Sequence, residues 1–224
     1  LRYRETAASY ERCTMDEESS FQQSRQSAAA QYHETMWRFC SEQVQLLVGR
    51  VVREGDDVLD VACGTGFAAL TALQMVGNAG RVVGTDINPA MLAMARTIPG
   101  GGDITWTAAS ALDLPFDEDE FDAVLCTQSA QFFPDVAAGV REMARVTRPG
   151  GRLALTVWTQ RADSPFLDAQ MEMLIEFCGI DPAVTNGAFI DDELTVRRWF
   201  HDAGLINVDV AVVRTEPDLP PIRE

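Results

Sequence analysis

The chain has 224 residues, of which 46% are hydrophobic and 23% charged, as expected of a globular protein with one sizeable core. Its formal net charge is −16 and no basic stripe compensates, which argues against nucleic acid as a partner and favours a neutral or cationic small molecule. No apolar run approaches the roughly 20 residues of a membrane-spanning helix, and no signal peptide is recognisable. Because the first residue is Leu rather than Met, we expect part of the natural N-terminus to be missing.

Cysteine and histidine usage indicates the compartment. The chain has five cysteines and two histidines. The cysteines are odd in number, widely spaced and without a C-x-x-C pair, which favours free thiols over a disulfide framework or a zinc site. We therefore expect a cytoplasmic protein with no metal site.

The first region, residues 1–54, is predicted to form an N-terminal helical lid. Apolar side chains recur at three-to-four spacing over residues 31–52, which indicates a helix with one buried face. Residues 55–57 (Gly-Asp-Asp) form a turn.

From residue 58 onward, predicted strands and helices alternate. The strands are 58–62, 81–85, 104–108, 121–126 and 152–158, with a tight turn at 148–151 before the last. The helices between them are 66–76, 89–97 and 135–147. This alternation predicts a Rossmann-like α/β fold, a mostly parallel, doubly wound sheet with helices on both faces and right-handed crossovers. We assign the core to residues 55–160.

The last region, residues 161–224, is predicted to hold acceptor-side helices and a late part of the sheet. Residues 160–183 and 191–203 have helical patterns, and 205–213 alternates as a strand. A Pro-rich tail follows. Whether a final strand is present in this chain, or a short segment such as 184–190 contributes to the sheet, stays open.

The turn after the first strand has the layout of a nucleotide-binding loop. Gly64 and Gly66 fit the pattern G-x-G-x-x-[G/A] ahead of a helix whose first N–H groups are free for a ligand. A strand that binds NAD is normally apolar up to its glycines, but this one contains Asp60. A buried carboxylate requires a partner, and the ammonium and sulfonium of S-adenosylmethionine (SAM) would supply one. The alternative is that Asp60 accepts hydrogen bonds from loop amides.

A second acid follows the second strand. Asp86 lies 20 residues after Gly66, where adenosine-binding folds place the carboxylate that binds the ribose hydroxyls. Helix capping is the alternative role, but Asn88 before Pro89 already supplies an N-cap. Ile87 would then flank the adenine.

Four segments in chain order resemble class I SAM-dependent methyltransferases, especially those of ubiquinone and menaquinone biosynthesis. They are VLDVACGTG (58–66), VVGTDINPAML (82–92), ALDLPFDEDEFDAVLC (111–126) and REMARVTRPGGRLALTVW (141–158). The resemblance covers about 55–160 well and 191–213 loosely.

The resemblance implies a set of SAM-binding residues. Those of the methionine loop are Asp60, Ala62, Gly64 and Gly66. The ribose and adenine contacts are Asp86, Ile87, Met91, Ser110 and Ala111, where Ser110 replaces the usual Asp and offers a weaker acceptor to the adenine amine. The backbone of Cys126 and Thr127 would face the SAM amino group and the methyl donor.

Methyl transfer from a sulfonium is an in-line displacement that needs alignment and water exclusion more than a strong base. The switch-point rule places the acceptor pocket above the carboxyl ends of the first and fourth strands. The candidates to line it are Thr127, Gln128, Ser129, Gln131, Phe132, Phe133, Trp158, Tyr32, His33 and Trp37. His33 is the candidate catalytic base, with a solvated or capping histidine as the alternative reading.

We therefore predict a SAM-dependent methyltransferase that acts on a small aromatic or apolar acceptor. A SAM-binding protein with a non-methylating role and an NAD-binding oxidoreductase stay open as alternatives. The sequence leaves open the acceptor, the O, N or C atom methylated, and the oligomeric state.

Overall fold

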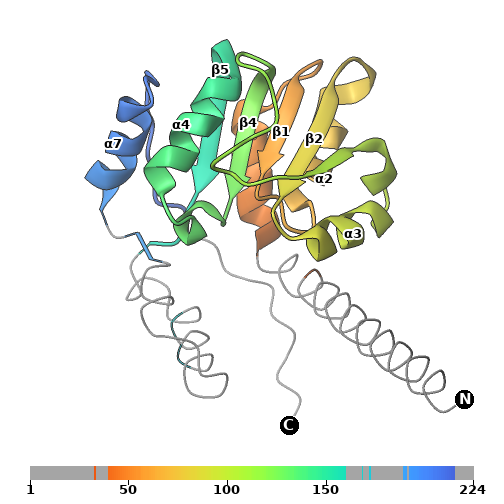
Figure 1. The fold of residues 1–224 in the computed structure, drawn as a ribbon, viewed down its shortest axis with the longest axis horizontal. Coiled ribbons are helices and arrows are strands. Elements are labelled where there is room, and N and C mark those ends of the chain that lie inside the picture. Colours follow the sequence, from red (N-terminus) through yellow and green to blue (C-terminus); the bar gives the residue numbers. More distant parts are fainter. Residues whose placement is uncertain are drawn as a thin grey trace, which may run out of the picture.

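A five-stranded, wholly parallel sheet forms the centre of the computed structural model (Figure 1). The structure describes residues 33, 40–159, 168, 172, 189–190 and 192–214. The strands lie in the order β3-β2-β1-β4-β5. Their bounds are β1 Asp57–Val61, β2 Arg81–Asp86, β3 Thr105–Ala108, β4 Phe121–Thr127 and β5 Thr147–Thr156.

Helices cover both faces of this sheet, as a doubly wound fold requires. Residues 40–51 form a helix, and the others are α2 (Phe67–Val76), α3 (Pro89–Thr97), α4 (Val136–Val146) and α7 (Glu193–Asp202). One buried cluster joins helix 40–51, α2 and α3 to one face, and a second joins α4 and α7 to the other (Figure 1). The predicted Rossmann-like fold is confirmed.

The predicted helix 31–52 has the expected buried face where the structure describes it. Cys40, Val44 and Val48 recur at intervals of four residues and are all at most 4% exposed. Their side chains pack in the same cluster as α2. The helix therefore lies against the sheet next to the turn that follows β1.

The central strand β1 pairs with both β2 and β4. The chain adds β2 and β3 on one side of β1 and then β4 and β5 on the other, so the order of the strands reverses at β1. Asp60 lies beside Gly84 of β2 and Leu125 of β4. In open α/β sheets, ligands bind where two neighbouring strands send their connections to opposite faces. The carboxyl ends of β1 and β4 are this position.

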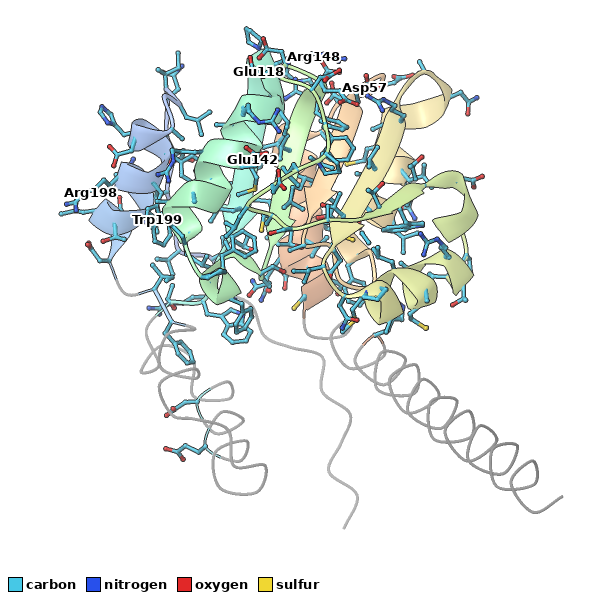
Figure 2. All side chains as sticks on the ribbon, viewed as in Figure 1. Asp57, Glu118, Glu142, Arg148, Arg198 and Trp199 are labelled. Carbon is cyan, nitrogen blue, oxygen red and sulfur yellow. The ribbon has the colours of Figure 1, made fainter. Side chains whose placement is uncertain are left out.

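Ion pairs hold the amino ends of the strands together, at the opposite edge of the sheet. Arg148 lies 3.1 Å from Asp57 of β1 and 2.6 Å from Asp122 of β4. Arg81 lies 3.4 Å from Asp57 and 2.9 Å from Glu120. Figure 2 shows Asp57 and Arg148 at this edge. These partly exposed pairs each contribute little alone, but they form one network far from the ligand edge.

The predicted strand 205–213 is wrong. Residues 205–214 form neither a strand nor a helix, and Ile206, Val212 and Val213 are 82%, 65% and 50% exposed. A strand needs a neighbour that satisfies its backbone groups, and sequence alternation alone supplies none. Trp158 forms an isolated parallel bridge with Phe189 instead, so part of the segment 184–190 does reach the sheet edge.

The fifth strand begins earlier than predicted, at Thr147, because the turn over 148–151 lies inside it. Phe121 pairs with Thr147 and Ala123 with Arg152, so β5 contains an irregular insertion that β4 lacks. Gly150 has φ +81° within this insertion. The strand ends at Thr156, so Trp158 lies just beyond it.

Several predicted segments lie outside the described residues. These are most of the lid up to residue 39, most of the helix 160–183 and the Pro-rich tail. The division of the chain at residues 54 and 160 stays a prediction. In the part that the structure describes, no helix is both long and apolar enough to cross a bilayer.

Trp106 of β3 packs in a space that two glycines leave open. A Cβ at Gly84 would lie 2.3 Å from the Trp106 ring, and one at Gly66 would lie 2.4 Å from it. The indole Nε1 donates to the carbonyl of Gly101 (2.7 Å), which fixes the ring in place. The ring therefore packs between β2 and the start of α2, directly beside the glycine loop.

We expect Gly84→Ala to destabilise the protein by about 1–3 kcal/mol, because the added methyl overlaps a well-fixed ring and overpacking costs about this much. Urea unfolding followed by circular dichroism measures the change. Gly102→Ala is the matched control, since a Cβ there meets nothing within 4 Å. Equal stability of the two variants would show that Trp106 moves aside freely.

Candidate functional site

The turn after β1 contains three residues in the left-handed region. Ala62, Gly64 and Gly66 have φ values of +52°, +56° and +86°. Glycine adopts this region at little cost, whereas an L residue such as Ala pays about 1–2 kcal/mol. Strained backbone of this kind is typical of ligand-binding turns. The conformation turns the chain sharply from β1 into α2.

Asp60 is fully buried near the carboxyl end of β1. Its Oδ2 accepts a hydrogen bond from the N–H of Ala69 in the first turn of α2 (2.9 Å), which is the alternative role considered for it. Its Oδ1 is buried and has no hydrogen-bond partner among the described residues. Burial raises the pKa of Asp60 to about 7, and the charge of Asp86 contributes to the rise. The carboxylate therefore has a structural role and also capacity for a further donor.

Asp86, at the end of β2, links the glycine loop to α3. Its Oδ2 accepts from the N–H of Gly64 (2.8 Å) and its Oδ1 from the N–H of Asn88 (2.8 Å). The Asn88 side chain accepts from Ala90 and caps α3, as the sequence predicts. Each carboxylate oxygen has further lone pairs, so Asp86 can still accept from ligand hydroxyls.

The predicted adenine contacts surround the ends of β2 and β3. Ile87 is 75% exposed, an unusual position for a large aliphatic side chain, and Met91 lies half-buried in the first turn of α3. The Ser110 hydroxyl accepts from Leu112 (3.2 Å) within a tight turn, so part of its hydrogen-bonding capacity is already used. Ala111 packs against the core on the α4 side.

The fourth strand supplies a second strained turn. Gln128 follows β4 with φ +55°, and its N–H donates to the backbone and side-chain oxygens of Thr156. The Ser129 hydroxyl lies 2.9 Å from the Ala62 carbonyl and 3.0 Å from that of Thr127, so it links the two turns. Cys126 is fully buried in the core, and only its backbone can face a ligand.

A small cavity lies between these two turns. The residues that line it come from helix 40–51 and from the turns after β1 and β4: Cys40, Val44, Ala62, Cys63, Gly64, Thr65, Phe67, Thr127, Gln128 and Ser129. Among the described residues, none of those that line the cavity is a lysine or arginine. The structure therefore brings together Ala62, Gly64, Thr127, Gln128 and Ser129, all of which the sequence analysis singled out.

His33 lies over the glycine loop. Its Nδ1 is 3.0 Å from the hydroxyl of Thr65, and its ring stacks on Phe67 at 4.7 Å between centroids. Both contacted residues line the cavity. The lid thus reaches the site at His33, whereas His201, on α7, has a side chain that is 86% exposed.

An aromatic group extends from the end of β4 towards β5. The ring of Phe132, which is 54% exposed, meets Trp158 edge-on at 5.5 Å, and Trp158 lies 5.9 Å from Phe189. Phe133, in contrast, packs against the α4 side of the core close to Gly139. Phe132 and Trp158 are therefore in contact with each other, and Phe133 lies apart from them in the core.

Two pocket candidates, Tyr32 and Trp37, lie outside the described residues. The sequence analysis did not select five of the cavity residues: Cys40, Val44, Cys63, Thr65 and Phe67. Thr65 and Cys63 could have been found because they lie within the glycine loop itself. Cys40 and Val44 gave no such signal, since they have the apolar spacing of an ordinary core helix.

The three thiols near the site are buried. Burial raises the pKa of Cys40 to about 11 and raises the pKa of both Cys63 and Cys126 well above the ordinary value. All three are free cysteines. Within the described ranges, no group of three or more metal-binding side chains gathers.

Comparisons with known proteins find methyltransferases. A model described as "Methyltransferase domain" matches residues 58–151, and one described as "Protein-L-isoaspartate(D-aspartate) O-methyltransferase (PCMT)" matches residues 8–98. The ubiquinone/menaquinone biosynthesis C-methyltransferase UbiE of Francisella philomiragia is 42% identical over 174 residues, which are 70% of each protein.

Other relatives match a smaller part. The 2-phytyl-1,4-naphtoquinone methyltransferase of Synechococcus elongatus is 37% identical over 107 residues, 46% of each protein. The chain thus spans about half the length of this curated relative. Among solved structures, a SAM-dependent methyltransferase from Aquifex aeolicus is similar in fold, with a TM-score of 0.54, 22% identity and coverage of 73% of this chain and 78% of that one.

The buried carboxyl of Asp60 gives a testable pH dependence. Because its pKa rises from 3.8 in the unfolded chain to about 7 in the fold, the native state holds the extra proton between these values. The contribution of Asp60 to the free energy of unfolding is then fully present below about pH 4. It is lost as the pH rises through about 7, by up to about 1.4 kcal/mol per pH unit. Asp60→Asn should remove this fall in urea unfolding of the ligand-free protein.

Glu142→Gln is the control for that comparison. Arg145 holds the pKa of Glu142 below its usual range, so its contribution to stability is lost only as the pH falls into the acid range. This variant should therefore keep the wild-type slope between pH 5 and 7. Parallel curves for the wild type and Asp60→Asn would contradict the raised pKa.

Ala62→Gly should stabilise the protein by about 0.5–1 kcal/mol, because glycine relieves the left-handed strain and only part of that gain is lost to unfolded-chain entropy. Thermal unfolding measures the effect. The same change in a helix, Ala93→Gly in α3, should instead cost about 1 kcal/mol. A loss of stability on Ala62→Gly would mean that the turn is not strained.

Proposed function

The chain belongs to the class I SAM-dependent methyltransferase family, and from this premise we propose that it transfers a methyl group from SAM to a small organic acceptor. The proposed acceptor is aromatic or apolar, because the names of two relatives refer to a naphthoquinone and to ubiquinone and menaquinone biosynthesis. The atom methylated stays open. A cytoplasmic location and the absence of a nucleic-acid partner also stay predictions.

The observation that carries the proposal is the position of Asp60. A dinucleotide's pyrophosphate normally binds at the N-terminus of the helix that follows the glycine loop. Here the Asp60 carboxylate already accepts a hydrogen bond from the Ala69 N–H in the first turn of that helix. A phosphate at the same N-terminus would be repelled by this carboxylate. Its other oxygen lacks a donor, which fits the ammonium of the SAM methionine and not a phosphate.

The adenosine half fits the ends of β2 and α3. We assign Asp86 to the ribose hydroxyls, because a carboxylate fixed by two amides is preorganised to accept two more hydrogen bonds. Ile87 supplies the apolar surface beside the adenine, and its high exposure in the structure is consistent with that role. Met91 and the Ser110–Ala111 turn complete the proposed adenine site.

SAM, when bound, supplies an electrophilic methyl group on a sulfonium. The chain's own residues must then align the acceptor and exclude water. The lid residue His33 and helix 40–51 cover the cavity from one side, and the turns after β1 and β4 from the other. Phe132 and Trp158 offer aromatic surface for a flat acceptor. For a hydroxyl acceptor, His33 is the candidate to receive the released proton.

The proposal is tested by transfer of a labelled methyl group from SAM to a panel of phenols, quinols and amines, with an isoaspartyl peptide as the protein-type acceptor. We expect label in at least one small aromatic acceptor. Asp86→Ala should weaken binding of S-adenosylhomocysteine by about 1.5–3 kcal/mol, the value of hydrogen bonds to a charged group, as measured by calorimetry.

Asp103→Ala, at an exposed acid in the loop before β3, is the matched control and should leave that affinity unchanged. Tight NADH binding without binding of S-adenosylhomocysteine would reject the family's cofactor for this chain. Unchanged affinity in a folded Asp86→Ala variant would reject the ribose assignment. Cofactor binding without transfer to any acceptor would favour a non-methylating role.

A further inference from the structure

The turn after β4 contains two glutamines whose amide oxygens have no donor. Within the described part of the chain, the buried side-chain polar atoms without a hydrogen-bond partner are Asp60 Oδ1, Gln128 Oε1 and Gln131 Oε1. Asp60 is accounted for by the proposed ammonium. Of the two glutamines, Gln128 lines the cavity between the turns after β1 and β4, whereas Gln131 is not among the lining residues described.

The orientation of Gln131 is fixed by its surroundings. Its side chain is buried, with the residue only 6% exposed, and its Nε2 donates to the backbone carbonyl of Gln128 (3.1 Å). A carbonyl can only accept, so the amide cannot be flipped without losing this bond. The oxygen of Gln131 is therefore necessarily the atom left without a partner.

The backbone and side chain of Gln128 are also fixed by hydrogen bonds. Its backbone is in the left-handed region and is anchored to β5 through Thr156. Its Nε2 lies 3.4 Å from Oε1 of Gln43 on helix 40–51, and the residue lines the cavity. Gln128 is thus a residue of the cavity wall with a carbonyl-type oxygen that has no donor among the described residues, and burial without a donor costs free energy.

Resting on the proposed function, we infer that Gln128 selects acceptors that carry an O–H or N–H donor, and that Gln131 holds this turn through its hydrogen bond to the Gln128 carbonyl. A carboxamide oxygen accepts a hydrogen bond but does not take up a proton at neutral pH, so Gln128 positions the acceptor group and does not deprotonate it. Acceptors that present only carbonyl or carboxylate oxygens would meet this oxygen with repulsion. The carboxylates Asp60 and Asp86 nearby on β1 and β2 oppose anionic acceptors further.

The inference is tested with two probes of the same ring, 1-naphthol and 1-methoxynaphthalene, which differ in the presence of the O–H donor. Binding is measured by calorimetry with S-adenosylhomocysteine present. We expect the wild type to prefer the naphthol about tenfold, the equivalent of one hydrogen bond of about 1.4 kcal/mol. Gln128→Met, which keeps side-chain length without the amide oxygen, should reduce the preference.

Two further variants separate polarity from shape. Gln128→Glu keeps an accepting oxygen and should retain the preference, whereas Phe132→Leu should weaken both probes equally. If the cofactor product binds and the two probes bind equally, or neither binds, the inference is overturned alone. If the cofactor product itself does not bind, the proposed function fails and this inference fails with it.

Discussion

The Asp60 carboxylate is the constraint around which the ligand edge of the sheet is organised. It lies in a central strand, fully buried, where ionisation is costly, and a single backbone N–H from α2 offsets only part of that cost. The same bond ties the start of α2 to β1 and so holds the glycine loop in its sharp turn. Binding a cation at its second oxygen would complete a pair that folding leaves incomplete.

The turns after β1 and β4 also contain groups that are in unfavourable states in the free protein. Ala62 and Gln128 adopt left-handed backbone at the ends of adjacent strands, and the Ser129 hydroxyl connects their turns. Strain and missing donors are both unfavourable in the free protein, and both occur where β1 and β4 end. The opposite edge of the sheet has the reverse character, since Arg148 there pairs with both Asp57 and Asp122. The ion pairs thus lie at the amino ends of the strands, and the strained turns and the groups without donors lie at the carboxyl ends.

Much of the fold could be predicted from local pattern, because the apolar strands and the turn and capping residues between the elements are strong signals. The Asn88–Pro89 start of α3 is one example, where a cap and a preset φ coincide. The strand predicted at 205–213 failed because alternation does not reveal whether a partner strand exists. The early start of β5 was hidden since Gly150 suggests a turn, although here the turn is an insertion within the strand.

The site was less accessible to prediction than the fold. Asp60 and Asp86 were selected as candidates because carboxylates at strand ends are conspicuous, whereas the hydrogen bonds that they accept from Ala69 and Gly64 depend on three-dimensional geometry. The left-handed conformations of Ala62 and Gln128 could not be inferred, since neither residue type requires them. Cys40 and Val44 entered the cavity lining only through the packing of their helix.

The indole of Trp106 has a consequence for how this sequence can diverge. One ring fills the space beside both Gly66 and Gly84. A smaller side chain at 106 would leave room for a methyl at 84, whereas any side chain at 66 stays strained because the φ angle there is +86°. The sizes of residues 84 and 106 are therefore coupled, which ties the packing beside the glycine loop to β3.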